Sequence, residues 1–242
     1  MALLARYGDI LHAEINSIHA AVHEYCADYL TADAADYPVT VTQADIDFER
    51  KKSAADAGIE LPKRTFSDSY LEELAVYRKI AEQMPRFDTI LFHASAIAVD
   101  GMAYLFTAKT GTGKSTHAGL WKKLLGERAV IDNDDKPLIR ISKNGTAAVY
   151  GTPWAGKHRL SSNISVPVRA ICMLERASDN AIRETTKAEA YPLLLQQTYR
   201  PADPDAMKRT LFLLDRLDVK LYRLRCNMDI CAAELSYNTM KA

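Results

Sequence analysis

The hydrophobic positions of the chain change their spacing several times, and each change predicts a different element. After residue 69, the sequence YLEELAVYRKIAEQM repeats its apolar residues at helical intervals, and Ser67 is the expected N-cap. Pro85 ends this predicted helix. Two continuous apolar runs follow, TILFHASAIAV at 89–99 and MAYLFTA at 102–108, separated only by Asp-Gly, a strong hairpin signal. We therefore expect two antiparallel strands here.

The remainder of the chain continues with alternating strand and helix patterns. The expected strands are AVIDN, KPLIRIS, TAAVY, VPVRAICMLER and VKLYRLRC, and the expected helices are STHAGLWKKLLG, KAEAYPLLLQQTYR, PDAMKRTLFLLDRL and MDICAAELSYNTM. Residues 1–65 mix short apolar runs with polar turns, and DFERKKSAADAGIELPKR at 47–64 is expected to be a charged connection.

Hairpins are predicted on both sides of the glycine-rich segment TGTGKST, and this arrangement decides the expected fold. An ordinary doubly wound protein alternates strands with helices in a parallel sheet. Here we expect an α/β (α+β-like) fold with a mixed, largely antiparallel sheet, packed helices and a phosphate-binding loop (P-loop) that follows a β-hairpin. Residues 1–85 are expected to form an N-terminal α/β lead-in or a small substrate-side subdomain, and residues 86–242 a nucleotide-binding catalytic core.

Composition and charge narrow the classes of partner and location. The 242 residues are 48% hydrophobic and 26% charged, with a formal net charge of zero. Such a chain can bury one substantial core beside a smaller unit. Balanced charge gives no reason to expect nucleic acid or an anionic membrane as a partner. No apolar run approaches the ~20 residues that span a bilayer, and the N-terminus does not resemble a signal peptide, so we expect a cytoplasmic location.

The segment AKTGTGKST at 108–116 nearly matches the P-loop (Walker A) pattern GxxxxGK[ST], with Ala108 at the place of the first glycine. A strand precedes it and a helix follows, so the helix N-terminus can face an anion. Alanine is tolerated if φ at the strand exit is negative. The alternative is a glycine-rich turn without a ligand. The expected phosphate-binding residues are Thr110, Gly111, Thr112, Gly113, Lys114, Ser115 and Thr116. Lys114 would contact the β- and γ-phosphates, and the Ser115 hydroxyl would hold Mg²⁺.

The hairpin also predicts the position of His93. If Asp100 and Gly101 form a two-residue turn, strand partners have numbers that sum to 201, which places His93 opposite Ala108. Opposed residues lie about 5 Å apart at Cα, so His93 would stand at the mouth of the P-loop. The alternative is a core histidine with ordinary structural partners.

An acidic pair and a glycine-rich basic segment supply further candidates. Asp134 and Asp135 end the short strand AVIDN, where carboxylates near a P-loop can bind Mg²⁺ or accept a proton from a hydroxyl. A solvated turn before a proline is the alternative, and Asp132 is the weaker candidate because it lies further inside the strand. In YGTPWAGKHRLSSN at 150–163, Lys157 or Arg159 can neutralise transition-state charge. The alternative is an ordinary surface loop.

These motifs carry a resemblance to a known family. His93-Ala94-Ser95, the hairpin, TGTGKST and Asn133-Asp134-Asp135 occur in the order found in the C-terminal domain of HPr kinase/phosphorylase. The chain resembles that family over roughly residues 88–160, and more distantly the nucleotide core of phosphoenolpyruvate carboxykinase. The resemblance implies a carboxykinase/HPr-kinase-like core. It also implies Asp134 as the base, His93 as its orienting partner, and Ser115 with Asp135 as the Mg²⁺ site.

Together these features predict a kinase that uses Mg²⁺ and ATP. It would transfer the γ-phosphoryl group to a hydroxyl acceptor, either a small metabolite or a serine hydroxyl, with Asp134, His93, Lys114 and Lys157 in the catalytic site. Residues 1–85 do not resemble the N-terminal domain of the family, so phosphorylation of HPr itself is not expected. Two alternatives remain open: a nucleotide-responsive ATPase or binding and assembly protein without a phosphoryl acceptor, and a scaffold with a vestigial site. The resemblance also hints at a homo-oligomer.

Overall fold

The chain divides into two compact units, Met1–Gln83 and Met84–Ala242. The computed structural model describes residues 2–7, 9–56, 66–156 and 159–242. The boundary expected from the sequence lay after residue 85. None of the helices among the described residues is long and apolar enough to cross a membrane.

The N-terminal unit combines a three-stranded sheet with helices. The sheet has the order β1-β2-β3, with β1 antiparallel to β2 and β2 parallel to β3. The strands are β1 (Ala2–Tyr7), β2 (Leu11–Asn16) and β3 (Tyr37–Thr40). The helices are α1 (Ala21–Tyr25), the 3-10 turn η1 (Ala27–Tyr29), α2 (Gln43–Asp56) and α3 (Asp68–Gln83).

The structure confirms one expected helix of this unit and corrects the expected connection. In α3, Ser67 caps the N-terminus by accepting a hydrogen bond from the Tyr70 backbone amide at 3.3 Å. Residues 47–56 of the expected charged connection are helical instead, because Gln43–Asp56 form α2, and residues 57–64 lie outside the described residues. Its charges have partners on α3, where Arg78 forms ion pairs with Asp45 and Glu49. Charged residues with good helix propensity thus continue a helix that packing stabilises.

The C-terminal unit is built on a nine-stranded sheet. The strands are β4 (Thr89–Leu91), β5 (Ser95–Val99), β6 (Met102–Thr107), β7 (Ala129–Asn133), β8 (Leu138–Ile141), β9 (Ala147–Tyr150), β10 (Ser165–Arg176), β11 (Ala181–Glu184) and β12 (Lys220–Cys226). Their order is β4-β8-β9-β10-β6-β5-β7, and β12 also pairs with β10 and carries β11. The long strand β10 is parallel to β6 and β12, whereas the other pairs are antiparallel. The mixed, largely antiparallel sheet is therefore confirmed.

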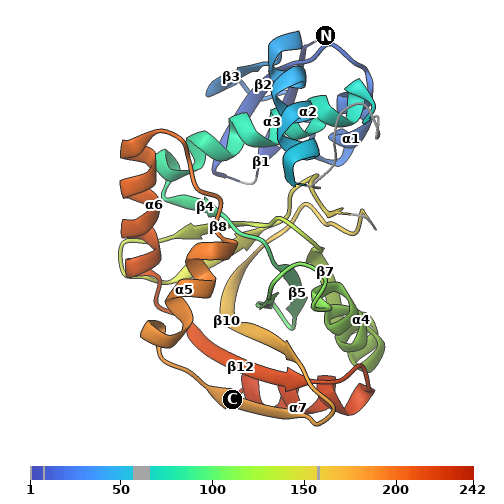
Figure 1. Ribbon diagram of the computed structural model, residues 1–242, viewed down its shortest axis with the longest axis vertical. Coiled ribbons are helices and arrows are strands. Elements are labelled where there is room, and N and C mark those ends of the chain that lie inside the picture. The colour runs from blue at the N-terminus through green and yellow to red at the C-terminus, as the bar shows by residue number, and fades with distance from the viewer. Residues whose placement is uncertain (1, 8, 57–65, 157–158) are drawn as a thin grey trace. The chain divides into compact units, whose positions relative to one another are not determined.

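Helices cover both faces of this sheet. They are α4 (Lys114–Leu125), α5 (Lys187–Gln197), α6 (Pro204–Arg216) and α7 (Ile230–Met240). Two 3-10 turns precede strands: η2 (Met84–Phe87) leads into β4, and η3 (Gly126–Arg128) leads into β7. Figure 1 shows α5 and α6 on one side of the sheet and α4 and α7 on the other, in agreement with two separate buried clusters. Trp121 of α4 is fully buried, and its Nε1 donates a 2.8 Å hydrogen bond to Ser236 of α7.

The hairpin that leads to the P-loop has the predicted register. Val99 pairs with Met102, and the ladder continues to Ser95 and Phe106. Asp100 and Gly101 both have positive φ, at 51° and 80°, as a two-residue hairpin turn with this sequence requires. The confirmed register therefore fixes β6, and the P-loop begins where this strand ends.

The apolar run 89–99 is not one strand, which corrects the prediction. It divides into β4, which pairs with β8, and β5, which pairs with β6 and β7. Between them the backbone amides of Phe92, His93 and Ala94 donate to carbonyls of Pro137, Gln197 and Asp135. These partners are distant in sequence, so an uninterrupted apolar pattern does not reveal the break. The break places His93 outside the ladder, which ends at Ser95 and Phe106, so the predicted pairing of His93 with Ala108 does not form.

Candidate functional site

The P-loop joins β6 to α4 through residues 108–113. Gly111 and Gly113 have φ values of 80° and 117°, a conformation that residues with a Cβ rarely adopt. Ala108 is buried and does not have a positive φ, so alanine is compatible with this position. The backbone thus bends at the two glycines and enters α4 at Lys114. This is the strand, turn and helix N-terminus that binds an anion in a phosphate loop.

Lys114 is the first residue of α4 and is only 8% exposed. Burial lowers the pKa of its ammonium, while the charges of Asp135 and Asp134 act to raise it and Lys136 acts to lower it. The lysine and the two aspartates therefore share one electrostatic environment, although about twenty residues separate them in sequence. The fold brings together the P-loop cation and the acidic pair that the sequence predicted.

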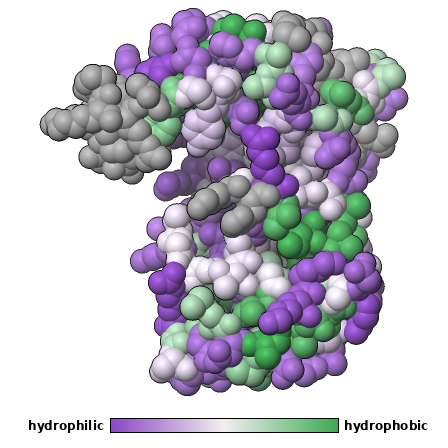
Figure 2. Space-filling model, turned by 90° about the vertical axis from the view of Figure 1, so that its right-hand side faces the viewer, coloured by the Kyte–Doolittle hydropathy of each residue, from purple (hydrophilic) through white to green (hydrophobic). Residues whose placement is uncertain are grey.

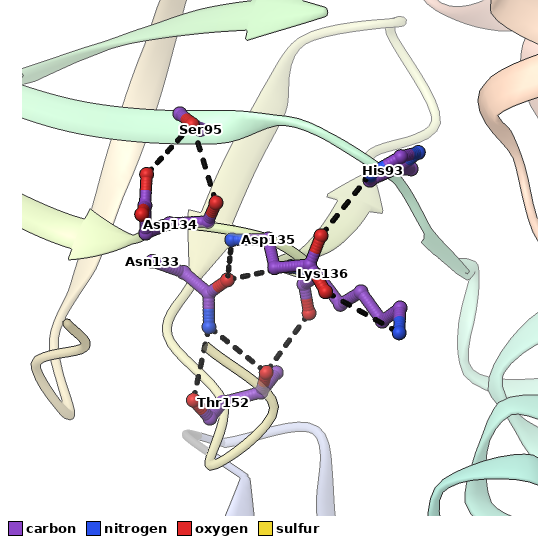
Figure 3. A network of polar contacts seen from close by, with 7 residues as sticks. All are labelled: His93, Ser95, Asn133, Asp134, Asp135, Lys136 and Thr152. Carbon is purple, nitrogen blue, oxygen red and sulfur yellow. Dashed lines mark hydrogen bonds and ion pairs between the residues drawn. The ribbon is translucent and has the colours of Figure 1, made fainter. Parts of the chain in front are cut away.

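His93 contacts Asp135, not Asp134 as the resemblance implied. Its Nε2 lies 3.1 Å from Asp135 Oδ1, and the Thr107 hydroxyl donates a 3.0 Å hydrogen bond to the His93 carbonyl at the end of β6. The Asp134 carboxylate is instead held by Ser95, whose Oγ donates to Oδ1 at 2.8 Å (Figure 3). The two aspartates point to different partners because adjacent residues at a strand end project in different directions.

A turn centred on Asn133 fixes the backbone of the acidic pair. The Asn133 Oδ1 accepts hydrogen bonds from the amides of Asp135 and Lys136, and its Nδ2 donates to the carbonyl and hydroxyl of Thr152 (Figure 3). Thr152 in turn donates to the Lys136 carbonyl at 2.8 Å. Asparagine is the residue type that forms such side-chain turns. The sequence analysis did not assign Asn133 and Thr152 this role, and only Asn-Asp-Asp before a proline signals it.

Asp135 is ionised at neutral pH. Burial acts to raise its pKa, but the hydrogen bond from His93 and the charges of Lys136 and His93 outweigh this effect, so the pKa is lower than usual. Lys136 Nζ lies 3.3 Å from Asp135 Oδ2. Asp134 is 5% exposed and lies next to it in sequence. The site therefore presents at least one stable negative charge beside the Lys114 ammonium.

Asp132 differs from the acidic pair. It is fully buried, and neither of its carboxylate oxygens has a hydrogen-bond partner among the described residues. Burial raises its pKa well above the usual value, with the backbone amide of Gly151 acting in the opposite direction. Because burial disfavours its charged form, Asp132 is less suited to bind a cation than Asp135 is.

The glycine-rich segment 150–163 lies against the acidic pair. Gly156 has a φ of 67°, and a Cβ built there would stand 2.9 Å from Asp135 Cβ. The amide of Asp134 donates to the Leu160 carbonyl at 3.0 Å. Trp154 is 4% exposed and is therefore not an open platform for a ligand. Lys157, the cation predicted to act here, lies outside the described residues, so its role stays a prediction.

Arg176, the last residue of β10, forms hydrogen bonds with the backbone of the P-loop. The sequence did not predict this role. The Arg176 guanidinium donates to the carbonyls of Gly111 and Thr112, the latter at 3.1 Å from Nε. These two carbonyls are thereby directed to Arg176, and within the loop the Thr112 amide donates to the Lys109 carbonyl at 3.2 Å. No local motif marks this arginine, because the parallel pairing of β10 with β6 brings it to the loop.

The other P-loop residues fit a magnesium nucleotide. Ser115 and Thr116 are exposed on the first turn of α4. No cluster of three or more histidine, cysteine, aspartate or glutamate side chains able to hold a metal occurs in the described part of the chain. A nucleotide-bound Mg²⁺ needs only one or two protein oxygens, because phosphates and water complete its coordination. Ser115 and the ionised Asp135 are donors of that kind.

Comparisons with known proteins leave the family open. No protein-family model matches the sequence, and no curated protein matches it. Among solved structures, the Hpr(Ser) kinase/phosphatase from Coxiella burnetii is similar, with 12% sequence identity and a TM-score of 0.36. The similarity covers 63% of this chain and 99% of that chain. This likeness does not assign the chain to a family, and the function is inferred from the site.

Proposed function

We propose that the chain is a kinase that uses Mg²⁺-ATP and transfers the γ-phosphoryl group to a hydroxyl acceptor. The observation that carries this proposal is the buried Lys114 at the start of α4, in one electrostatic environment with Asp134 and Asp135. A P-loop alone supports only nucleotide binding. The addition of ordered carboxylates supports phosphoryl transfer to a hydroxyl, which requires a metal and a proton acceptor.

The triphosphate would bind along the P-loop. Backbone amides of the turn and the first residues of α4 would hold its oxygens, and Lys114 would place a positive charge at the β- and γ-phosphates. Ser115 and Asp135 would hold Mg²⁺, which neutralises charge on the phosphates when bound. His93 lies 3.1 Å from Asp135 and lowers its pKa, so this carboxylate would be charged and available to a metal at neutral pH. His93 is thus a positioning residue in this proposal.

Asp134 would take the proton from the acceptor hydroxyl as the hydroxyl attacks phosphorus in line. Ser95 donates a 2.8 Å hydrogen bond to one oxygen of this carboxylate, and the Asp134 backbone amide donates to the Leu160 carbonyl at 3.0 Å. A base held in this way loses little freedom when the acceptor binds. The acceptor would be a small metabolite or a serine hydroxyl.

The test is ADP release with Mg²⁺-ATP and a pool of small hydroxyl compounds and serine peptides. We expect acceptor-dependent ADP release from the natural protein and a fall of about 1,000-fold in kcat for Asp134→Asn, with nucleotide affinity retained. The matched control is Asp205→Asn, which removes an exposed carboxylate on α6 that forms an ion pair with Lys208. Its rate should equal that of the natural protein.

Two outcomes would contradict the proposal. Turnover that does not depend on any acceptor, and that Asp134→Asn leaves intact, would indicate the nucleotide-responsive ATPase instead. Nucleotide binding without any turnover, in the presence of the whole acceptor pool, would indicate a binding protein. Either result would leave the nucleotide site itself in place and remove the assignment of Asp134 as a base.

A further inference from the structure

A cavity of about 320 Å³ opens beside the P-loop, and neither aspartate of the acidic pair lines it. Thr112, Gly113 and Thr116 form one of its walls. Cavities that bind small organic ligands begin at about 300 Å³ and are mostly apolar with a few polar groups. The size is that of a nucleoside, and the wall shared with the P-loop makes the two sites continuous.

The other walls are largely apolar and come from α4 and the ends of β10 and β12. Leu120 and Leu174 line the cavity, and Met228 stands at it with 76% of its surface exposed. Figure 2 views the side of the molecule that carries α4, where hydrophobic side chains reach the surface among hydrophilic ones. Methionine adapts to flat aromatic groups through its flexible chain and polarizable sulfur. This lining suits a planar base better than a charged group.

His117 adds one polar group to this wall. Ser236 Oγ accepts from Trp121 Nε1 and donates to the carbonyl of Ala232 or Ala233, and it lies 3.0 Å from His117 Nε2. His117 is only 3% exposed, and its Nδ1 is buried without a hydrogen-bond partner among the described residues. The ring is therefore a fixed part of the cavity wall.

The direction of a bound triphosphate follows from the positions of Lys114 and Thr116 in the first turn of α4. In a P-loop the lysine reaches the β- and γ-phosphates, so the γ end of the chain would lie at Lys114, the first residue of α4. Thr116 lies two residues further along α4 and lines the cavity. The α-phosphate end would therefore lie at Thr116 and lead directly into the cavity.

On the basis of the proposed function, we propose that this cavity binds the nucleoside of the phosphoryl donor, with a purine base between Leu120, Leu174 and Met228. The cavity would then determine selection between a nucleotide and a bare polyphosphate. Arg176, which lines the cavity and binds the P-loop carbonyls, would link base binding to the shape of the loop.

The experiment compares the affinities for Mg²⁺-ATP and Mg²⁺-tripolyphosphate by calorimetric titration. Leu120→Trp fills the cavity, and Met228→Trp blocks it from an exposed position that the fold tolerates. We expect each variant to bind ATP about tenfold more weakly and tripolyphosphate within about twofold of the natural protein. The matched control is Phe212→Trp on α6, which is 48% exposed and does not line the cavity. It should change neither affinity.

Retained tripolyphosphate binding shows that a variant is folded at the P-loop. If both tryptophan variants bind ATP as tightly as the natural protein does, the cavity is not the nucleoside site. If the natural protein binds tripolyphosphate as tightly as ATP, the base makes no contact and the inference also fails. The proposed function fails separately, if Lys114→Ala in the otherwise natural chain changes the affinity for neither ligand.

Discussion

The two ends of the P-loop differ in every physical property that matters for binding. The carboxylate end, defined by His93, Ser95, Lys114, Asp134 and Asp135, is charged and ordered by short polar contacts. The cavity end, defined by Leu120, Leu174, His117 and Met228, is largely apolar, and burial lowers the pKa of its histidine to about 4. In the proposed function, one turn would serve two tasks, with phosphoryl transfer at one end and nucleoside binding at the other. Variants at the first end should lower kcat, and variants at the second should lower affinity.

The largest effect is expected for Asp135→Asn, at the carboxylate end. This change removes the negative charge that His93, Lys136 and Lys114 face, and with it the proposed Mg²⁺ ligand. We expect kcat/KM to fall about 1,000-fold, since an uncompensated buried charge costs several kcal/mol. Steady-state kinetics over a series of Mg²⁺ concentrations measures kcat/KM and its dependence on the metal. An unchanged Mg²⁺ requirement would show that Asp135 does not hold the metal.

The next effect concerns stability and belongs to the cavity end. The pKa of His117 is about 4 in the folded chain and 6.5 in the unfolded chain, so the unfolded chain binds more protons between these values. The contribution of His117 to the free energy of unfolding is fully present above pH 6.5. As the pH falls, this free energy decreases, by about 3 kcal/mol at pH 4. Urea unfolding of the natural protein and of His117→Gln from pH 7 to pH 4 measures the difference. Parallel pH profiles would contradict a neutral buried histidine.

Gly156→Ala tests the position of Asp135 without removing its charge. The added Cβ would stand 2.9 Å from Asp135 Cβ and 3.2 Å from Cγ, so the carboxylate has to move. We expect about a 100-fold loss of kcat, because small displacements at a reacting centre have effects of this size. Gly126→Ala is the matched control: φ there is also positive, at 60°, but nothing lies within 4 Å of the new Cβ. Equal activities of the two variants would refute the displacement.

The smallest effect is expected for Arg176→Ala, which lies between the two ends. Without the guanidinium, the carbonyls of Gly111 and Thr112 lose their donors. We expect Kd to rise about tenfold for both ATP and tripolyphosphate, unlike the variants that fill the cavity. Arg225→Ala, which removes an exposed arginine paired with Asp179, is the control. A loss confined to ATP would place Arg176 at the base and not at the loop.

Much of the fold of the C-terminal unit could be predicted because local patterns decide it. The Asp-Gly turn sets the register from Val99 to Ser95, and two glycines set the P-loop bend. The break at 92–94 could not be predicted, since backbone groups of Asp135, Pro137 and Gln197 cause it. Likewise α2 was missed because charged residues hide a helix that packing on α3 stabilises.

The candidate site could be predicted in its residues but not in its pairings. Lys114, Asp134, Asp135 and His93 were identified from motifs and register. That His93 pairs with Asp135 depends on the conformation of the broken strand, which no spacing encodes. Ser95 was part of the recognised motif without a role, and Arg176 reaches the P-loop only through the parallel pairing of β10 and β6.

The most direct test of the account is the affinity of Lys114→Ala for Mg²⁺-ATP. The lysine is the buried cation between the P-loop and the acidic pair, so its loss should weaken binding about 100-fold. Lys123→Ala, an exposed lysine on the same helix, is the matched control and should bind normally. Titration calorimetry with both variants gives the answer. An unchanged Kd for Lys114→Ala would contradict a nucleotide site at this loop, and with it the proposed kinase.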